Sequence, residues 1–202
     1  MPEKLQTDEE FIEKISKISP KELFFVKTEA LTELNATLAL IKSDITDDQR
    51  RCLTNYFAVR LVSWIENYFK NSVIWLIDHY GLEYPDFKLE LKLPDLKKIQ
   101  KAEDFTAGKI VSKEMNFQNL GIIFGTINSI LQINDFSDRL EQQRVDIGRI
   151  SQILQVRHEI IHNFGNCGWD SAQCLEAKQS VFQLIYFCNE ITIQRLKELE
   201  IY

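Results

Sequence analysis

The stretch between residues 46 and 80 most constrains this chain, because it contains neither glycine nor proline. It opens with Thr46-Asp47-Asp48-Gln49, which has the pattern of a capping box, and it is followed by Gly81, a helix stop signal. We therefore predict one long helix from about residue 46 to Tyr80. The whole chain has only 7 glycines and 4 prolines in 202 residues, which favours long helices over a loop-rich β fold.

Similar start and stop signals predict further helices along the chain. We expect them at about residues 7–18, 19–42, 116–132, 145–163 and 170–200. Residues 82–113 differ, because Phe87, Leu89, Leu91 and Leu93 alternate with charged residues at the two-residue period of a strand. That strand could pair near Ile110-Val111. The prediction is an all-α bundle in one domain, with 1–45 as an N-terminal helical extension and 82–113 as an insertion.

Charge and cysteine usage narrow the class of protein. The net charge of −6 argues against non-specific coating of nucleic acid but permits a small, locally basic site. The first ten residues are acidic and do not resemble a signal peptide, and no apolar run approaches the roughly 18 residues needed to cross a membrane. The four cysteines lack C-x-x-C spacing, so we expect reduced thiols in a cytoplasmic protein.

One charged residue interrupts the apolar stripe of the helix predicted at 145–163. Ile147, Ile150, Leu154 and Ile161 repeat at helical spacing, and Arg157 occupies the position that the stripe skips. An unpaired buried charge is unfavourable, so Arg157 either lies at the edge of the stripe and extends to water or has a partner.

An acidic residue interrupts the long helix in the same way. Val59, Val62, Phe69, Val73 and Leu76 keep the apolar rhythm, and Glu66 takes the missing position. We infer that Glu66 and Arg157 face a shared, partly buried polar site. A plain structural ion pair is the alternative explanation.

The segment around Arg157 contains two overlapping motifs. His158-Glu159-Ile160-Ile161-His162 matches the H-E-x-x-H pattern, in which two histidines one turn apart bind Zn²⁺ and the glutamate acts as general base. A zinc peptidase also needs a third protein ligand and a substrate-holding sheet, and no upstream segment resembles that sheet. Cys167, Cys174, Glu176 and Glu190 are the ligands that remain open, without a recognised spacing.

The second motif is Arg157, four intervening residues and His162, and it resembles the R-x4-6-H signature of the HEPN superfamily. His158 fits the polar residue that follows the arginine in that signature. The stretch LVSWIENYFKNSV, residues 61–73, is similar to the HEPN helix with an acidic residue in an apolar setting, and Glu66 is the matching position. Residues 116–131 are similar to the helix before the motif helix in RiboL-PSP-type members. The likeness covers most of 47–200 as an order of helices.

The resemblance implies an HEPN-like helical bundle that acts as a metal-independent endoribonuclease, without a cofactor. His162 would be the acid or base and Arg157 the phosphate clamp, with His158, Asn163 and Glu66 as supports. The implied partners are an RNA substrate, a second copy of the chain and, in a toxin or anti-phage defence setting, an antitoxin; no membrane is involved. The alternative is a non-catalytic HEPN-like module that binds RNA or protein.

On an ideal helix Arg157 and His162 lie about 140° apart, so they could meet at one site only if Arg157 reaches around or if the helix loosens near Asn163 and Gly165. The implied chemistry needs both an acid and a base, whereas the motif supplies one clearly placed histidine per chain, so we expect a homodimer with a composite site. The exposed face of the final helix and the apolar residues near Phe164 and Trp169 are the expected contact surfaces.

Overall fold

The computed structural model describes residues 8–18, 28–80 and 106–199, and every regular element in these ranges is a helix. This confirms the all-α prediction for that part of the chain. The helices are α1 (Asp8–Ile18), α2 (Thr28–Ile41), α3 (Asp47–Tyr80), α5 (Ala107–Glu114), α6 (Leu120–Leu131), α7 (Phe136–Gln142), α8 (Ile147–His162) and α9 (Ser171–Glu198). The alternating segment at 87–93 and the predicted helix start at Ser19-Pro20 lie outside the described residues.

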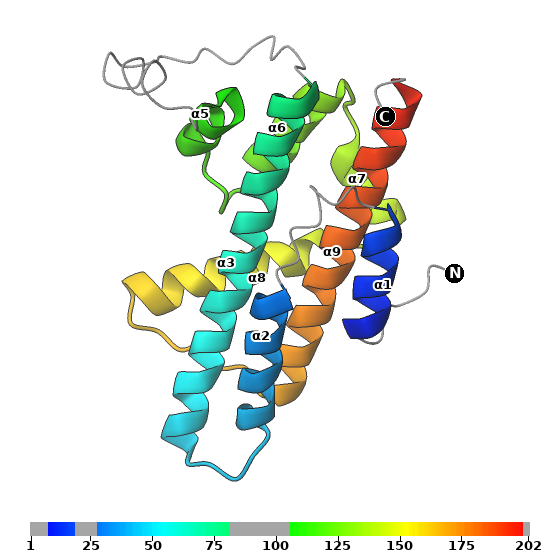
Figure 1. The fold of residues 1–202 in the computed structure, drawn as a ribbon. Helices are drawn as coiled ribbons and strands as arrows, with labels where there is room; N and C mark the ends of the chain where they lie inside the picture. Colours follow the sequence, from blue (N-terminus) through cyan, green and yellow to red (C-terminus); the bar gives the residue numbers. More distant parts are fainter. Residues whose placement is uncertain (1–7, 19–27, 81–105, 200–202) are drawn as a thin grey trace.

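Two long helices, α3 and α9, run side by side through the molecule, and the other helices pack around them (Figure 1). The capping box predicted at the start of α3 is present, because the Gln49 amide donates to Thr46 Oγ1 at 3.3 Å and the Thr46 amide donates to Gln49 Oε1 at 3.0 Å. Helix α8 crosses both long helices, so its residues can contact α3 (Figure 1).

The core is one continuous cluster of apolar side chains. Its largest fully buried members include Phe57, Phe69, Phe136 and Phe182, which come from three different helices. Leu34 and Ile41 of α2 belong to the same cluster. Helix α2, which lies within the predicted N-terminal helical extension, therefore contributes to the common core.

The predicted strand pairing near Ile110-Val111 is wrong, because both residues lie inside α5. Thr106 caps this helix, and its hydroxyl accepts the Lys109 amide at 3.3 Å. The helix packs very closely on α3, since a Cβ added at Gly108 would lie 2.5 Å from the carbonyl oxygen of Ile74. Asp78 of α3 also accepts the Gly108 amide at 2.7 Å. These contacts favour a helix where local composition suggested an extended segment.

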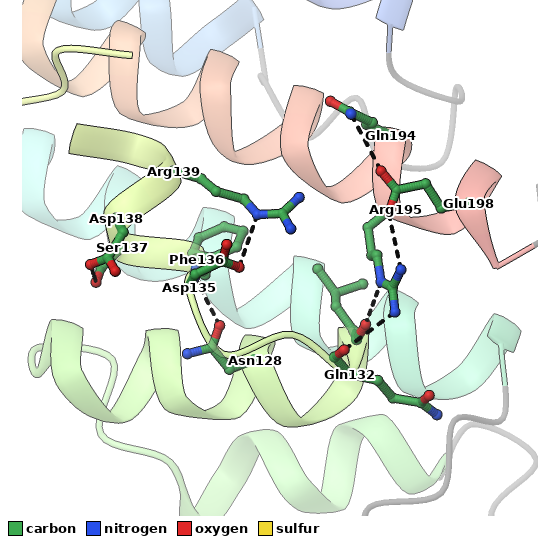
Figure 2. Close-up of polar contacts among 11 residues, drawn as sticks. Asn128, Gln132, Asp135, Phe136, Ser137, Asp138, Arg139, Gln194, Arg195 and Glu198 are labelled. Atoms are coloured by element: carbon green, nitrogen blue, oxygen red, sulfur yellow. Dashed lines mark hydrogen bonds and ion pairs between the residues drawn. The ribbon is translucent and has the colours of Figure 1, made fainter. Parts of the chain in front are cut away.

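One arginine side chain donates hydrogen bonds to the backbone carbonyl groups at the end of a neighbouring helix. Arg195 of α9 points to the end of α6, where its Nε donates to the carbonyl oxygen of Leu131 at 3.0 Å and its Nη2 to that of Gln132 at 3.3 Å (Figure 2). Glu198 accepts a hydrogen bond from Nη1 of the same arginine at 2.9 Å.

Helix α7, which the sequence did not predict, begins after α6. The Asn128 side chain accepts the Phe136 backbone amide at 3.1 Å (Figure 2). Arg195 thus links α9 to the end of α6, and Asn128 links α6 to the start of α7.

Across the three described ranges, no helix has the length and apolar character that a membrane crossing requires. The four cysteines are free in the structure, and Cys174 and Cys188 are buried.

Candidate functional site

The two charged residues that interrupt apolar stripes meet in the structure. Arg157 of α8 donates from Nη1 to Oε1 of Glu66 on α3 at 3.1 Å. Their side chains are 27% and 21% exposed, so the pair is neither fully buried nor fully solvated. The predicted contact is confirmed, and it joins helices whose residues are 91 positions apart in sequence.

Arg157 keeps hydrogen-bonding capacity after this contact. A guanidinium has five N–H donors, and the Arg157 Nε is buried without a hydrogen-bond partner among the described residues. Glu66 orients the planar group from one side. The remaining donors of Nη1 and Nη2 have the fork geometry that matches a phosphate.

The two histidines of α8 form a second feature on the outside of the same helix. His158 and His162 are both exposed, and their ring centroids lie 4.6 Å apart at an interplanar angle of 40°. They are one helical turn apart, so they present imidazole nitrogens to solvent as a pair.

Arg157 and His162 do not share a face of α8. The helix is continuous through His162, and Asn163 is its C-cap residue, so the helix does not loosen before the second histidine. Five residues on a regular helix correspond to about 140° of rotation and about 7.5 Å of rise. The arginine therefore faces α3 while the histidine faces solvent.

Asn163 and Glu159 fix the end of α8. The Asn163 side chain donates from Nδ2 to Glu159 Oε2 at 2.8 Å, and its backbone amide donates to the Glu159 carbonyl at 3.2 Å. The Gly165 amide reaches the same carbonyl at 2.9 Å. The helix end predicted near Asn163 and Gly165 is confirmed, and Asn163 has a structural partner here.

The apolar stripe of α8 ends earlier than predicted. Ile150 and Leu154 are buried as expected, and Ile153 joins them, but Ile161 is 43% exposed. Phe164 is 95% exposed with a left-handed backbone, φ 51°. The outer end of α8 is therefore a mixed surface of imidazole, amide, carboxylate and apolar groups.

Sequence analysis missed Asn55 of α3, which holds the segment after α8. Its Nδ2 donates to the Gly165 carbonyl at 3.4 Å, and its Oδ1 accepts the Cys167 amide at 3.0 Å. Two hydrogen bonds from one side chain thus attach this segment to the long helix. No periodicity or spacing links positions 55 and 167, so no sequence signal pointed to this contact.

A third misplaced charge, Lys178 of α9, was also missed. It is buried, and its Nζ lies 2.7 Å from Asp8 Oδ1 and 2.5 Å from Asn35 Oδ1. The signal was present, because Lys178 lies between buried Cys174 and Val181 at helical spacing. This cluster joins α1, α2 and α9.

The donors around the histidine pair do not fit a zinc peptidase. Among the residues that the structure describes, no three His, Cys, Asp or Glu side chains are grouped closely enough to hold a metal ion. Burial raises the pKa of Cys174 to about 12, with Cys167 and Asp170 adding to the shift, and a zinc-ligating cysteine must be a thiolate. Burial also raises the pKa of Glu190. The third ligand left open by the sequence is therefore not supplied.

No family model matches the chain, and no curated protein or solved structure matches it significantly. The resemblance to HEPN proteins therefore rests on the residues quoted above.

Proposed function

We propose that this protein is a metal-independent endoribonuclease of HEPN type. The observation that best supports the proposal is the half-buried Arg157, which is held by one carboxylate and keeps free donors within the R-x4-H motif. An arginine that only joined two helices would be expected to have its buried nitrogens satisfied.

The proposed reaction uses the RNA as its own nucleophile. The 2′-oxygen attacks the adjacent phosphorus while a base removes its proton, and the bond from phosphorus to the 5′-oxygen breaks as an acid protonates that oxygen. Histidine can do either task near neutral pH, and Arg157 would stabilise charge on the phosphoryl oxygens. The products are a 2′,3′-cyclic phosphate and a 5′-hydroxyl.

The separation of Arg157 from His162 supports a site completed by a second chain. His79 does not supply the missing histidine, since it lies thirteen residues beyond Glu66 on α3, about 20 Å along the axis. A two-fold contact through the outer end of α8 would bring His162 of one chain toward Arg157 of the other. Ile161 and Phe164 offer exposed apolar area for such a contact. The final helix offers less than expected, because half of its 28 residues are buried.

A non-catalytic HEPN-like module is the second candidate. The same separation favours it, because a monomer presents Arg157 inward and the histidines outward. The exposed end of α8 is also not uniformly basic, since Glu159, Ile161 and Phe164 are exposed beside the histidines. On this alternative, the Arg157–Glu66 pair is a structural ion pair.

The deciding experiment incubates purified protein with total RNA, with and without EDTA. We expect cleavage in both conditions, with Arg157→Ala and His162→Ala each reducing the rate by about 10²–10⁴-fold, the range of acid–base catalysis. Glu159→Gln should have a mild effect, and His79→Ala is the matched histidine control. Circular dichroism checks that each variant keeps its helices. Loss of activity in EDTA with recovery in Zn²⁺ would contradict the metal-independent mechanism, and absence of cleavage would favour the non-catalytic module.

Sedimentation over a dilution series tests the composite site. We expect the rate per chain to fall as the dimer dissociates, because each site would take residues from both copies. Mixing inactive Arg157→Ala with inactive His162→Ala should restore part of the activity. A monomer that cleaves RNA at full rate would contradict this arrangement.

A further inference from the structure

The histidine pair has the geometry of a binding site that the nuclease reaction does not need. His158 and His162 are exposed, lie one turn apart on a continuous helix, and have ring centroids 4.6 Å apart. Two imidazoles on one tetrahedral ion have ring centres about 5 Å apart, because each metal–nitrogen bond is about 2.0–2.1 Å. The observed centroid distance is therefore close to that of two imidazoles on one ion.

We propose that His158 and His162 form a two-imidazole site for a late first-row divalent cation such as Zn²⁺, Ni²⁺ or Cu²⁺. Neutral imidazole is a preferred ligand for these ions, whereas Mg²⁺ and Ca²⁺ prefer oxygen. The site differs from a peptidase centre because no third protein ligand is grouped with the pair among the described residues. Water completes the coordination, and the ion exchanges freely with solvent.

The neighbouring carboxylate does not convert this site into a three-ligand centre. Glu159 follows His158 directly, so its side chain leaves the helix about 100° around from that histidine. Its Oε2 accepts the Asn163 amide at 2.8 Å, and this bond directs it to the helix end. The ion is therefore held by two ligands from one helix, and its affinity depends equally on both.

Occupancy of this site regulates the reaction proposed above, and this consequence rests on the proposed function. A metal ion occupies a lone pair of the His162 ring, which then cannot accept or donate the catalytic proton. The cation is thus an inhibitor of RNA cleavage and not its cofactor. A chelator should leave the rate unchanged or raise it.

Metal binding is tested without RNA, by calorimetric titration of the tag-free full chain with Zn²⁺. We expect one ion per chain in the wild type. His158→Ala and His162→Ala should each weaken binding by at least about tenfold, because even partners behind the metal ligands change affinity by 10–100-fold. His79→Ala is the matched control and should bind like wild type, since that ring stacks on Trp75. A double replacement of Cys52 and Cys167 by serine controls for the free thiols and should also bind like wild type.

The regulatory consequence is tested by the ratio of cleavage rates with and without Zn²⁺. We expect a low ratio for wild type and for His79→Ala, and a ratio near one for His158→Ala. Equal Zn²⁺ binding by wild type and His158→Ala would contradict the proposed metal site. RNA cleavage by a wild-type protein that binds no Zn²⁺ would also contradict it. If Zn²⁺ binding requires both histidines but the protein cleaves no RNA, the metal site is supported and only the proposed nuclease function is contradicted.

Discussion

Two cationic side chains lie on the apolar faces of two helices in this protein, and their surroundings differ. Lys178 of α9 is 5% exposed and contacts both Asp8 and Asn35, and its ammonium also lies 5.2 Å from the Phe182 ring centroid. Arg157 of α8 is 27% exposed and contacts Glu66. The lysine is deeper and has more partners, whereas the arginine is shallower and keeps a buried nitrogen without one.

The difference separates a cation that holds helices together from one that the proposed function assigns to ligand binding. A buried charge is tolerated when its hydrogen bonds are satisfied, and Lys178 meets that condition while joining α1 and α2 to α9. Arg157 joins α3 and α8 through a single carboxylate, and in the proposed nuclease its remaining Nη donors would bind the phosphate. We therefore expect the Lys178 cluster to determine stability and the Arg157 pair to determine activity.

The largest effect on stability is expected at Asp8. Asp8→Ala removes the carboxylate that pairs with the Lys178 ammonium. Leaving a buried charge unpaired typically costs about 3–5 kcal/mol. Lys178→Met should cost less, because it removes the charge and retains most of the volume. Urea denaturation measures both, and cleavage per folded molecule should be unchanged. Equal stability of Asp8→Ala and wild type would show that α1 contributes little to the fold.

A smaller effect is expected for the Arg157–Glu66 pair, which is part-exposed. Single replacements by alanine should each cost about 1–3 kcal/mol, between the values for exposed and buried pairs. The double replacement should cost less than the sum, since each single variant leaves the other charge without its partner. Chemical denaturation of all four proteins gives the coupling energy, and additive costs would contradict the observed contact.

Most of the fold could be predicted from the sequence, because long helices repeat their signals many times. The 34 residues of α3 carry an apolar stripe, and in the sequence they are preceded by the capping residue Thr46 and followed by Gly81. The short helices α5 and α7 have 8 and 7 residues, too few turns for periodicity to distinguish helix from strand. Helix α5 depends on its close approach to α3 at Gly108, which is a tertiary contact and leaves no local pattern.

The candidate site shows the same limit. Stripe interruptions predicted the contact of Arg157 with Glu66, and helix geometry predicted the angular separation from His162. The same logic applied to α9 would have found Lys178. Its partner Asn35 lies 143 positions away and interrupts no charge pattern, so only the packing of α2 on α9 reveals it.

The smallest effect is expected for the Arg60–Glu33 pair, whose side chains are 41% and 34% exposed and therefore more accessible than those of the other two clusters. Replacing Arg60 by alanine should cost about 0.2–1 kcal/mol. The hydrogen bond from Arg60, assisted by one from Tyr56, lowers the pKa of Glu33 below its ordinary value of 4.5. The contribution of a carboxylate with a lowered pKa is present above pH 4.5 and is lost as the pH falls through its folded value. The stability difference between wild type and Arg60→Ala should therefore be larger at pH 7 than at pH 3.

The two hydrogen bonds of Asn55 have a consequence for hydrogen exchange. The Cys167 amide donates to a side chain 112 positions earlier in the chain, so it is protected only while the segment after α8 is docked on α3. Local opening of this segment exposes the amide without unfolding the core, and its exchange rate then measures the free energy of that opening. Asn55→Ala should accelerate exchange at Cys167 and leave the amides in the middle of α9 unchanged. One amide proton thus reports how firmly the histidine-bearing end of α8 is held in place.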